Sequence, residues 1–133
     1  MKRGALYLDS SALIKLVFEE HETDALETFL RDRPLRVSSV LTRVEVMRAA
    51  RTASDELVAR HADAVLRAVE LIAPDTALLA EAARLDPLAL RMLDAVHLAT
   101  ALALLDDIDG MVVYDRRLAE AAREAGLTVW APA

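Results

Sequence analysis

Four acidic residues of this sequence stand next to or within apolar segments, where an isolated charge is costly. They are Asp9, Glu45, Asp94 and Asp115. Burying an unpaired charge is strongly unfavourable, so a buried carboxylate requires a cationic partner or a metal ion. Hard divalent cations such as Mg²⁺ prefer oxygen ligands. Two such cations can hold the attacking and the leaving oxygen of a displacement at phosphorus. As a set, the four acids therefore predict divalent-cation chemistry at a phosphate ester.

Two of the acids occupy equivalent places in the sequence. Asp9 directly follows the apolar run 5–8, and Asp115 directly follows the apolar run 111–114. If these runs are neighbouring parallel strands, both carboxylates lie at the carboxyl edge of the sheet, where ligand sites of open α/β folds form. Each acid also precedes a predicted helix, and Asp is a favoured N-cap residue. Helix capping therefore remains open as the alternative for each of them taken by itself.

Asp94 interrupts the apolar face of a predicted helix. Helical spacing places five residues on one stripe of that helix: Leu90, Asp94, His97, Ala101 and Leu105. A carboxylate among core-facing residues needs a positive partner. A metal ion is one candidate for Asp94, and a salt bridge to Arg91 or to a distant arginine is the alternative. His97 is expected to pack beside the acids rather than to bind a metal ion.

Glu45 also lies in a predicted helix among apolar neighbours, and two explanations for it remain open. Thr42 and Glu45 have the spacing of a capping box, in which two side chains satisfy backbone donors at a helix start. Leu41 already looks helical, however. A helix that includes Leu41 places Thr42 inside the helix and leaves Glu45 for a site.

Other catalytic constellations have no support in the sequence. There is no cysteine, which excludes a disulfide framework and a thiolate metal site. Neither a Ser-His-Asp set nor a glycine-rich phosphate loop is apparent. His21 and His61 are expected at the surface, without metal-ligand spacing.

Short apolar runs alternate with longer amphipathic segments, a pattern typical of strands that alternate with helices. Strands are expected over 5–8, 35–37, 71–72, 111–114 and 128–130. Helices are expected over 10–18, 21–31, 41–53, 56–69, 74–85, 90–105 and 116–125. This order predicts an α/β fold: one domain over residues 1–133, with a parallel β-sheet that carries helices on both faces.

Composition excludes several classes of protein. Of the 133 residues, 55% are hydrophobic and only 3 are glycine, so the chain is neither disordered nor a low-complexity repeat. The longest mostly apolar stretch, 95–105, is shorter than the roughly 20 residues of a membrane-spanning helix. Asp9 and Lys15 interrupt the apolar run that follows Lys2 and Arg3, which argues against a signal peptide and predicts a cytoplasmic protein. The net charge of -6 disfavours loose binding of nucleic acids, although cations held by the acids could meet phosphates.

Four strings of the sequence, in their order and spacing, resemble the PIN-domain ribonucleases and, within them, the VapC-type toxins of bacterial toxin–antitoxin modules. The strings are LDSSALIK from Leu8, TRVEV from Thr42, LDAVHLATA from Leu93 and VYDRRL from Val113. The resemblance covers nearly the whole chain and implies a single PIN-like α/β domain over residues 1–133.

The resemblance implies an endoribonuclease that cleaves single-stranded regions of RNA with Mg²⁺ or Mn²⁺. The family's acidic quartet, which would serve both catalysis and metal binding, corresponds to Asp9, Glu45, Asp94 and Asp115. The family's hydroxyl residue corresponds to Ser11, with Ser10 beside it. Ser11 is expected to bond a carboxylate or a water bound to the metal ion, with satisfaction of backbone donors as the alternative. Arg116 and Arg117 could meet an RNA phosphate, or could form a solvated helix face.

The resemblance also implies partners. Such toxins usually form homodimers and bind a small VapB-type antitoxin, whose C-terminal segment lies over the active site. The apolar surfaces over 13–18 and 26–30 are candidate grooves for that antitoxin, with ordinary core packing as the alternative.

Two other functions remain open. A small phosphotransfer domain shares the parallel α/β fold and the acidic pocket, but it requires a lysine near the end of a late strand, and the only lysines are Lys2 and Lys15. A phosphatase with an aspartate nucleophile would need a second Asp two residues after Asp9, where Ser11 stands. The non-enzymatic alternative is a binding scaffold whose acids only cap helices, and it would gain no stability from Mn²⁺.

Overall fold

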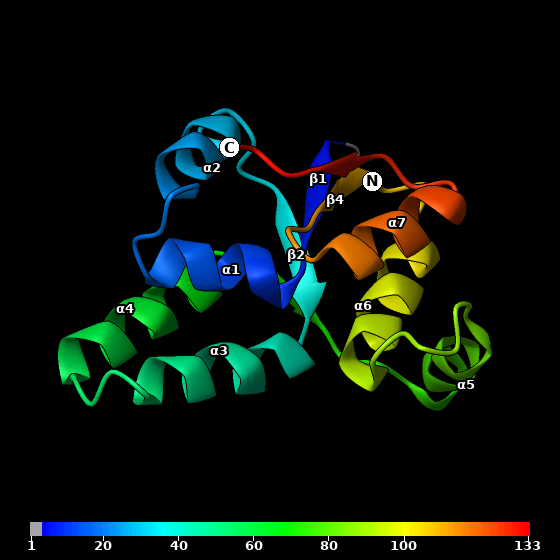
Figure 1. The fold of residues 1–133 in the computed structure, drawn as a ribbon, viewed down its shortest axis with the longest axis horizontal. Coiled ribbons are helices and arrows are strands. Elements are labelled where there is room, and N and C mark those ends of the chain that lie inside the picture. Colours follow the sequence, from blue (N-terminus) through cyan, green and yellow to red (C-terminus); the bar gives the residue numbers. More distant parts are fainter. Residues whose placement is uncertain (1–3) are drawn as a thin grey trace.

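The computed structural model describes residues 4–133, and within them strands and helices alternate in the expected order (Figure 1). The strands are β1 (Ala5–Leu8), β2 (Arg36–Ser39), β3 (Glu70–Ile72), β4 (Ile108–Val112) and β5 (Val129–Trp130). The helices are α1 (Ser10–Val17), α2 (Thr23–Leu30), α3 (Leu41–Arg51), α4 (Glu56–Arg67), α5 (Thr76–Arg84), α6 (Met92–Ala103) and α7 (Arg116–Glu124). Each expected helix and strand is present, with ends that differ by a few residues. Over this part of the chain, no helix combines the length and apolarity that crossing a membrane requires.

The strands form one parallel sheet in the order β3-β2-β1-β4-β5. From β1 the chain adds β2 and β3 on one side, and then returns to add β4 and β5 on the other. The direction of winding therefore reverses between β1 and β4, whose pairing ends with Leu8 opposite Val112. Ligand sites of open parallel sheets form at this reversal, outside the carboxyl ends of the strands.

Helices cover both faces of the sheet, as Figure 1 shows, and this confirms the predicted architecture. On one face, Leu8 of β1 belongs to a buried cluster with Leu13 of α1 and with residues of α2, α3 and α4. On the other face, Tyr7 belongs to a cluster with Leu98 of α6 and Leu118 of α7. Every residue of β1 is buried, so the carboxyl end of this central strand has a well-determined position.

Strand β4 differs from the strand expected over 111–114. It begins at Ile108 and ends at Val112, because its length follows its pairing with β1. Asp109 and Gly110 break the apolar pattern, which hides the first half of the strand from a sequence interpretation. Asp115 therefore does not follow the strand directly, as predicted, but only after a short connection.

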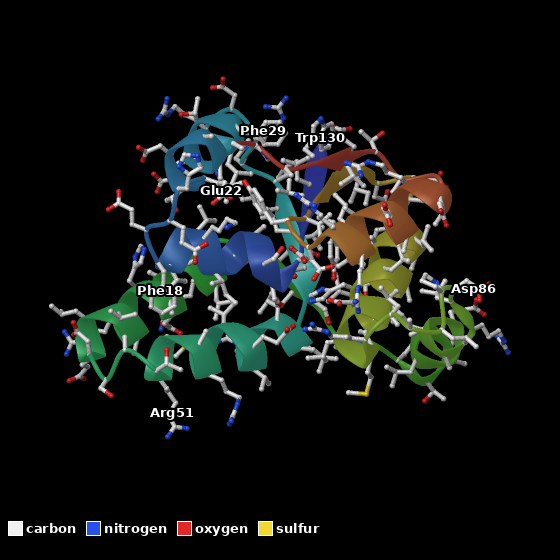
Figure 2. All side chains as sticks on the ribbon, viewed as in Figure 1. Phe18, Glu22, Phe29, Arg51, Asp86 and Trp130 are labelled. Carbon is white, nitrogen blue, oxygen red and sulfur yellow. The ribbon has the colours of Figure 1, made fainter. Side chains whose placement is uncertain are left out.

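The C-terminal segment crosses from β5 towards α2 (Figure 1). Trp130 packs on Phe29 of α2, with the ring centroids 5.5 Å apart (Figure 2). The hydroxyl of Tyr114 donates a hydrogen bond of 2.7 Å to the carbonyl of Pro132. This bond ties the connection between β4 and α7 to the end of the chain.

Candidate active site

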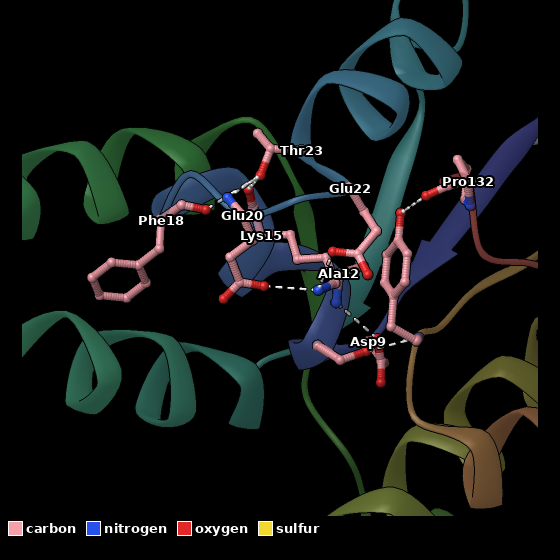
Figure 3. Close-up of polar contacts among 10 residues, drawn as sticks. Asp9, Ala12, Lys15, Phe18, Glu20, Glu22, Thr23 and Pro132 are labelled. Carbon is pink, nitrogen blue, oxygen red and sulfur yellow. Dashed lines mark hydrogen bonds and ion pairs between the residues drawn. The ribbon is translucent and has the colours of Figure 1, made fainter.

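Asp9 lies immediately after β1, beside the point where the winding of the sheet reverses. The residue is 2% exposed. Its Oδ1 accepts hydrogen bonds from the Ala12 N–H at 3.1 Å and from the Ser11 hydroxyl at 2.6 Å, so Asp9 does cap α1 (Figure 3). Among the described residues both bonds use Oδ1, and Oδ2 of this buried carboxylate is left for another ligand.

Ser11 connects two segments of this edge. Its hydroxyl donates to Asp9 and accepts a hydrogen bond of 3.0 Å from the backbone N–H of Tyr114. Asp115, the residue after Tyr114, caps α7 by accepting a hydrogen bond of 3.0 Å from the Leu118 N–H. Ser11 thus meets both expectations for it, since it bonds a carboxylate and satisfies a backbone donor, and it links the end of β1 to the segment that carries Asp115.

Glu45 lies in the second turn of α3, and the capping-box explanation for it is wrong. Thr42 is inside α3 and fully buried, and its hydroxyl lies 2.6 Å from Ser10 Oγ instead of capping a helix start. Ser10 donates to Glu45 Oε1, and His97 Nε2 lies 3.2 Å from the same oxygen. Partial burial raises the pKa of Glu45, but the hydrogen bonds from His97 and Ser10 outweigh burial and hold the pKa below its ordinary value. Glu45 is therefore ionised at neutral pH.

Asp94 is partly buried in the first turn of α6. Within residues 4–133 it forms no ion pair, so the salt-bridge alternative is not supported. Burial raises the pKa of Asp94 and the charges of Asp115 and Glu45 raise it further, whereas His97 and, to a smaller extent, Arg91 lower it without cancelling the rise. Burial likewise raises the pKa of Asp9 to about 6, with a smaller contribution from Asp94. Asp94 thus interacts electrostatically with each of the other three acids at this edge of the sheet.

The donor set suits a hard cation that is bound largely through water. In the part of the chain that the structure describes, no three carboxylate or imidazole groups lie close enough together to enclose a metal ion by themselves. Mg²⁺ usually binds through one or two carboxylates and keeps several waters, so it needs no such cage. Burial raises the pKa values of Asp9 and Asp94, so their ionised forms are disfavoured, and a bound cation would offset that cost. These residues therefore fit Mg²⁺ or Mn²⁺.

The basic residues near the site differ in exposure. Arg116 and Arg117 are exposed at the start of α7, next to Asp115 in sequence. Lys15 is largely buried, with only 14% of its side chain exposed. It pairs with Glu20 at 2.7 Å and with Glu22 at 3.0 Å (Figure 3).

The helix faces expected to form antitoxin grooves are divided between core and surface: Ile14, Leu16, Phe18 and Phe29 are only partly buried, so a groove over them stays a prediction. Leu13, Leu26 and Leu30 are at most 2% exposed, because α1 and α2 turn these residues onto the sheet. A concave surface of about 440 Å³ lies beside the same helices, and the residues lining it include Leu16, Arg31, Arg36, His61 and Val65.

Two polar partners of the site residues escape the sequence patterns. The Tyr7 hydroxyl lies 2.7 Å from His97 Nδ1, and Thr42 contacts Ser10. His97 is 2% exposed and packs beside the acids, as expected. The sequence does carry one signal for such a partner: Tyr7 is the tyrosine of an otherwise aliphatic buried strand, and a buried phenol needs a hydrogen-bond partner.

Ionisation of Asp9 is expected to destabilise the metal-free protein relative to an Asp9→Asn variant. Burial raises the pKa of Asp9 from 3.8 to about 6. The folded state therefore binds the proton more tightly than the unfolded state, and this stabilisation is present at low pH and lost as the pH rises from about 4 to about 6. Wild type should lose roughly 2 kcal/mol relative to Asp9→Asn between pH 4 and pH 7, measured by urea unfolding in EDTA. A difference between the two proteins that is independent of pH would contradict the raised pKa.

Known proteins resemble this chain in sequence and in fold. The family model described as the PIN domain matches residues 6–124. Ribonuclease VapC46 of Mycobacterium tuberculosis is 45% identical over 129 residues, which cover 97% of this chain and 98% of that protein. Ribonuclease VapC35 of the same organism is 42% identical over 131 residues, which cover 96% of each chain.

A solved structure is similar as well. It is the crystal structure of Mycobacterium tuberculosis VapC20, described as a sarcin–ricin loop cleaving toxin. The two structures superpose with a TM-score of 0.73 over 92% of this chain and 96% of that one, at 16% sequence identity, so this likeness concerns the fold. The sequence matches run from β1 to α7 and include the elements that carry the four acids. The chain therefore belongs to the VapC ribonucleases of the PIN-domain family.

Proposed function

We propose that this protein is an endoribonuclease that depends on Mg²⁺ or Mn²⁺ and acts as the toxin of a toxin–antitoxin module. The observation that carries the proposal is the cluster of interacting carboxylates at the reversal point of the sheet, in a chain that is 45% identical to a named VapC ribonuclease. A capping role alone does not explain the cluster, because neither Asp94 nor Glu45 caps a helix.

The acids have distinct tasks in this proposal. Asp9, Asp94 and Asp115 would hold the cation, and Glu45 would complete the site from α3. A bound divalent cation would neutralise charge on the phosphodiester and activate the attacking water. Oδ1 of Asp9 and of Asp115 is held by helix-capping bonds, so each carboxylate presents its second oxygen in a defined direction. Ser11 keeps the two segments in register by bonding to both.

The substrate would be a single-stranded region of RNA. The chain carries a net charge of -6, so affinity for RNA has to come from local basic groups rather than from overall charge. Arg116 and Arg117 are exposed beside Asp115, where a phosphate on the carboxylate-bound cation would come within their reach. Contacts of this kind position the backbone of RNA and do not select its sequence.

The partners would be those of a VapC toxin: a VapB-type antitoxin and a second copy of the chain in a homodimer, in the cytoplasm. The antitoxin would have to cover an acidic site that is open to solvent at Asp94, Asp115 and Glu45. A basic segment would complement that charge.

Cleavage of RNA is expected only when a divalent cation is present. Wild-type protein would be incubated with total cellular RNA in Mn²⁺, in Mg²⁺ and in EDTA, and new 5′ ends would be mapped by sequencing. Discrete ends should appear with either cation and vanish in EDTA. In parallel, Mn²⁺ at a hundred times its Kd should stabilise the RNA-free protein by about 2.7 kcal/mol. A protein that neither cuts RNA nor gains stability from Mn²⁺ would be a scaffold whose acids only organise helices.

A further inference from the structure

A buried hydrogen-bond cluster lies directly behind Glu45. It joins four side chains from four different elements: Tyr7 of β1, Ser10 of α1, Thr42 of α3 and His97 of α6. All four are at most 5% exposed. Glu45 is the group through which this cluster reaches the site, because Ser10 and His97 both bond its Oε1.

The protons of the cluster can be assigned by counting donors. The single proton of the Ser10 hydroxyl is donated to Glu45 Oε1, so Thr42 and His97 must be donors towards Ser10 Oγ, at 2.6 and 3.1 Å. His97 Nε2 therefore carries a proton, which Ser10 Oγ and Glu45 Oε1 share. In the neutral imidazole this proton leaves Nδ1 as an acceptor, and the phenol of Tyr7, which burial keeps protonated, then donates to Nδ1 at 2.7 Å. Each proton in the chain thus points towards Glu45.

His97 also relates Glu45 to a second acid. It lies one turn after Asp94 on α6, so the same short helix carries Asp94 and the imidazole that holds Glu45. Helices α3 and α6 are far apart in sequence, and His97 and Glu45 are separated by 52 residues. The His97–Glu45 contact therefore sets the distance between Asp94 and Glu45, which lie on helices far apart in the sequence.

We propose that His97 is a positioning residue for the cleavage reaction: its Nε2–H holds Oε1 of Glu45 and thereby aims Oε2 at the cation site, while Tyr7 fixes the imidazole from behind. The inference rests on the proposed function. Hydrogen-bond partners of metal-binding groups typically contribute 10–100-fold to metal affinity or activity. His97 is buried and does not reach the RNA, so its effect should appear in kcat and in metal affinity and not in KM.

The test compares two amide variants that differ in which ring nitrogen they replace. In His97→Gln the amide nitrogen stands three bonds from Cβ, as Nε2 does, and can still donate to Glu45. In His97→Asn the amide stands two bonds from Cβ, as Nδ1 does, and can meet Tyr7 but not Glu45. Both variants lose the ring, and Asn is also one methylene group smaller than Gln, so the free energy of unfolding of each variant is measured alongside. The readouts are kcat and KM on a labelled transcript that spans a mapped cleavage site, and the Kd of Mn²⁺ for the RNA-free protein from the electron paramagnetic resonance signal of free Mn²⁺.

In His97→Asn we expect the Kd of Mn²⁺ to rise and kcat to fall by about tenfold or more, with KM unchanged. In His97→Gln both quantities should stay within about threefold of wild type, well below the 10–100-fold loss expected for Asn. Wild-type values in His97→Asn, or equal losses in the two variants, would overturn the proposal and make the imidazole a packing residue only.

A second variant covers the case in which His97→Asn does not fold. Tyr7→Phe removes one oxygen behind the imidazole and keeps the ring in the core. It should lower kcat several-fold with KM unchanged, and an unchanged kcat would overturn the proposal. Failure of the proposed function looks different, because wild type itself would then neither cleave RNA nor bind Mn²⁺.

Discussion

Replacing Asp94 by Asn should abolish RNA cleavage while leaving the metal-free fold at least as stable as wild type. Asp94 is partly buried and without an ion-pair partner among the described residues, and burial and the charges of Asp115 and Glu45 raise its pKa more than His97 and Arg91 lower it. Its pKa is raised, so the folded state favours the protonated form and ionisation at neutral pH opposes folding. Asparagine keeps the shape and removes the charge. It therefore relieves the repulsion and removes a ligand for the cation.

We expect the rate of cleavage by Asp94→Asn to fall by at least about a hundredfold, since preorganised electrostatic groups contribute on this scale. The melting temperature in EDTA should stay the same or rise. Asp109→Asn is the matched control, because Asp109 is an exposed acid in β4, away from the carboxyl edge of the sheet. Normal activity of Asp94→Asn would remove Asp94 from the site. A loss of several kcal/mol of stability in EDTA would instead identify it as a structural charge partner.

The second large effect concerns growth. Expression of the wild-type chain without its antitoxin should arrest the host, and Asp9→Asn should restore growth to the level of an empty vector. The structure favours Asn over Ala at this position. An alanine would leave the buried donors of Ala12 and Ser11 without an acceptor, at a cost of about 1–3 kcal/mol for each unsatisfied group. Asparagine keeps the acceptor oxygen, so the loss of toxicity reports on the charge and not on folding.

The control for this growth experiment is the yield of soluble protein together with capture of a co-expressed VapB-type antitoxin. Asp9→Asn should match wild type in soluble yield and should still retain the antitoxin, because Asp9 is 2% exposed and offers almost no surface to a partner. Full toxicity of Asp9→Asn would rule out the metal-dependent nuclease. Lost toxicity with lost solubility would assign Asp9 to folding.

Much of the fold follows from local patterns in the sequence. Apolar runs that alternate with amphipathic segments predict each helix and strand, because the periodicity of burial is a local property of each element. The position of Asp9 directly after a buried strand could be predicted for the same reason, and so could its role as a helix cap. The clearest errors fall where local signals conflict. Asp109 and Gly110 conceal the start of β4, and the Thr42–Glu45 spacing imitates a capping box inside a helix.

Only the tertiary structure decides which of these residues meet. The strand order places β4 beside β1, and this makes neighbours of Asp9 and the segment that carries Asp115. Tyr7 and His97 are 90 residues apart, yet their hydrogen bond lies at the centre of the cluster behind Glu45. No short-range pattern encodes such a contact, because a side-chain hydrogen bond needs only two polar groups brought together by packing of elements distant in the chain. The sequence by itself therefore determined which acids were available and on which elements, and the packing of α3 and α6 around β1 decided that they lie at the same edge of the sheet.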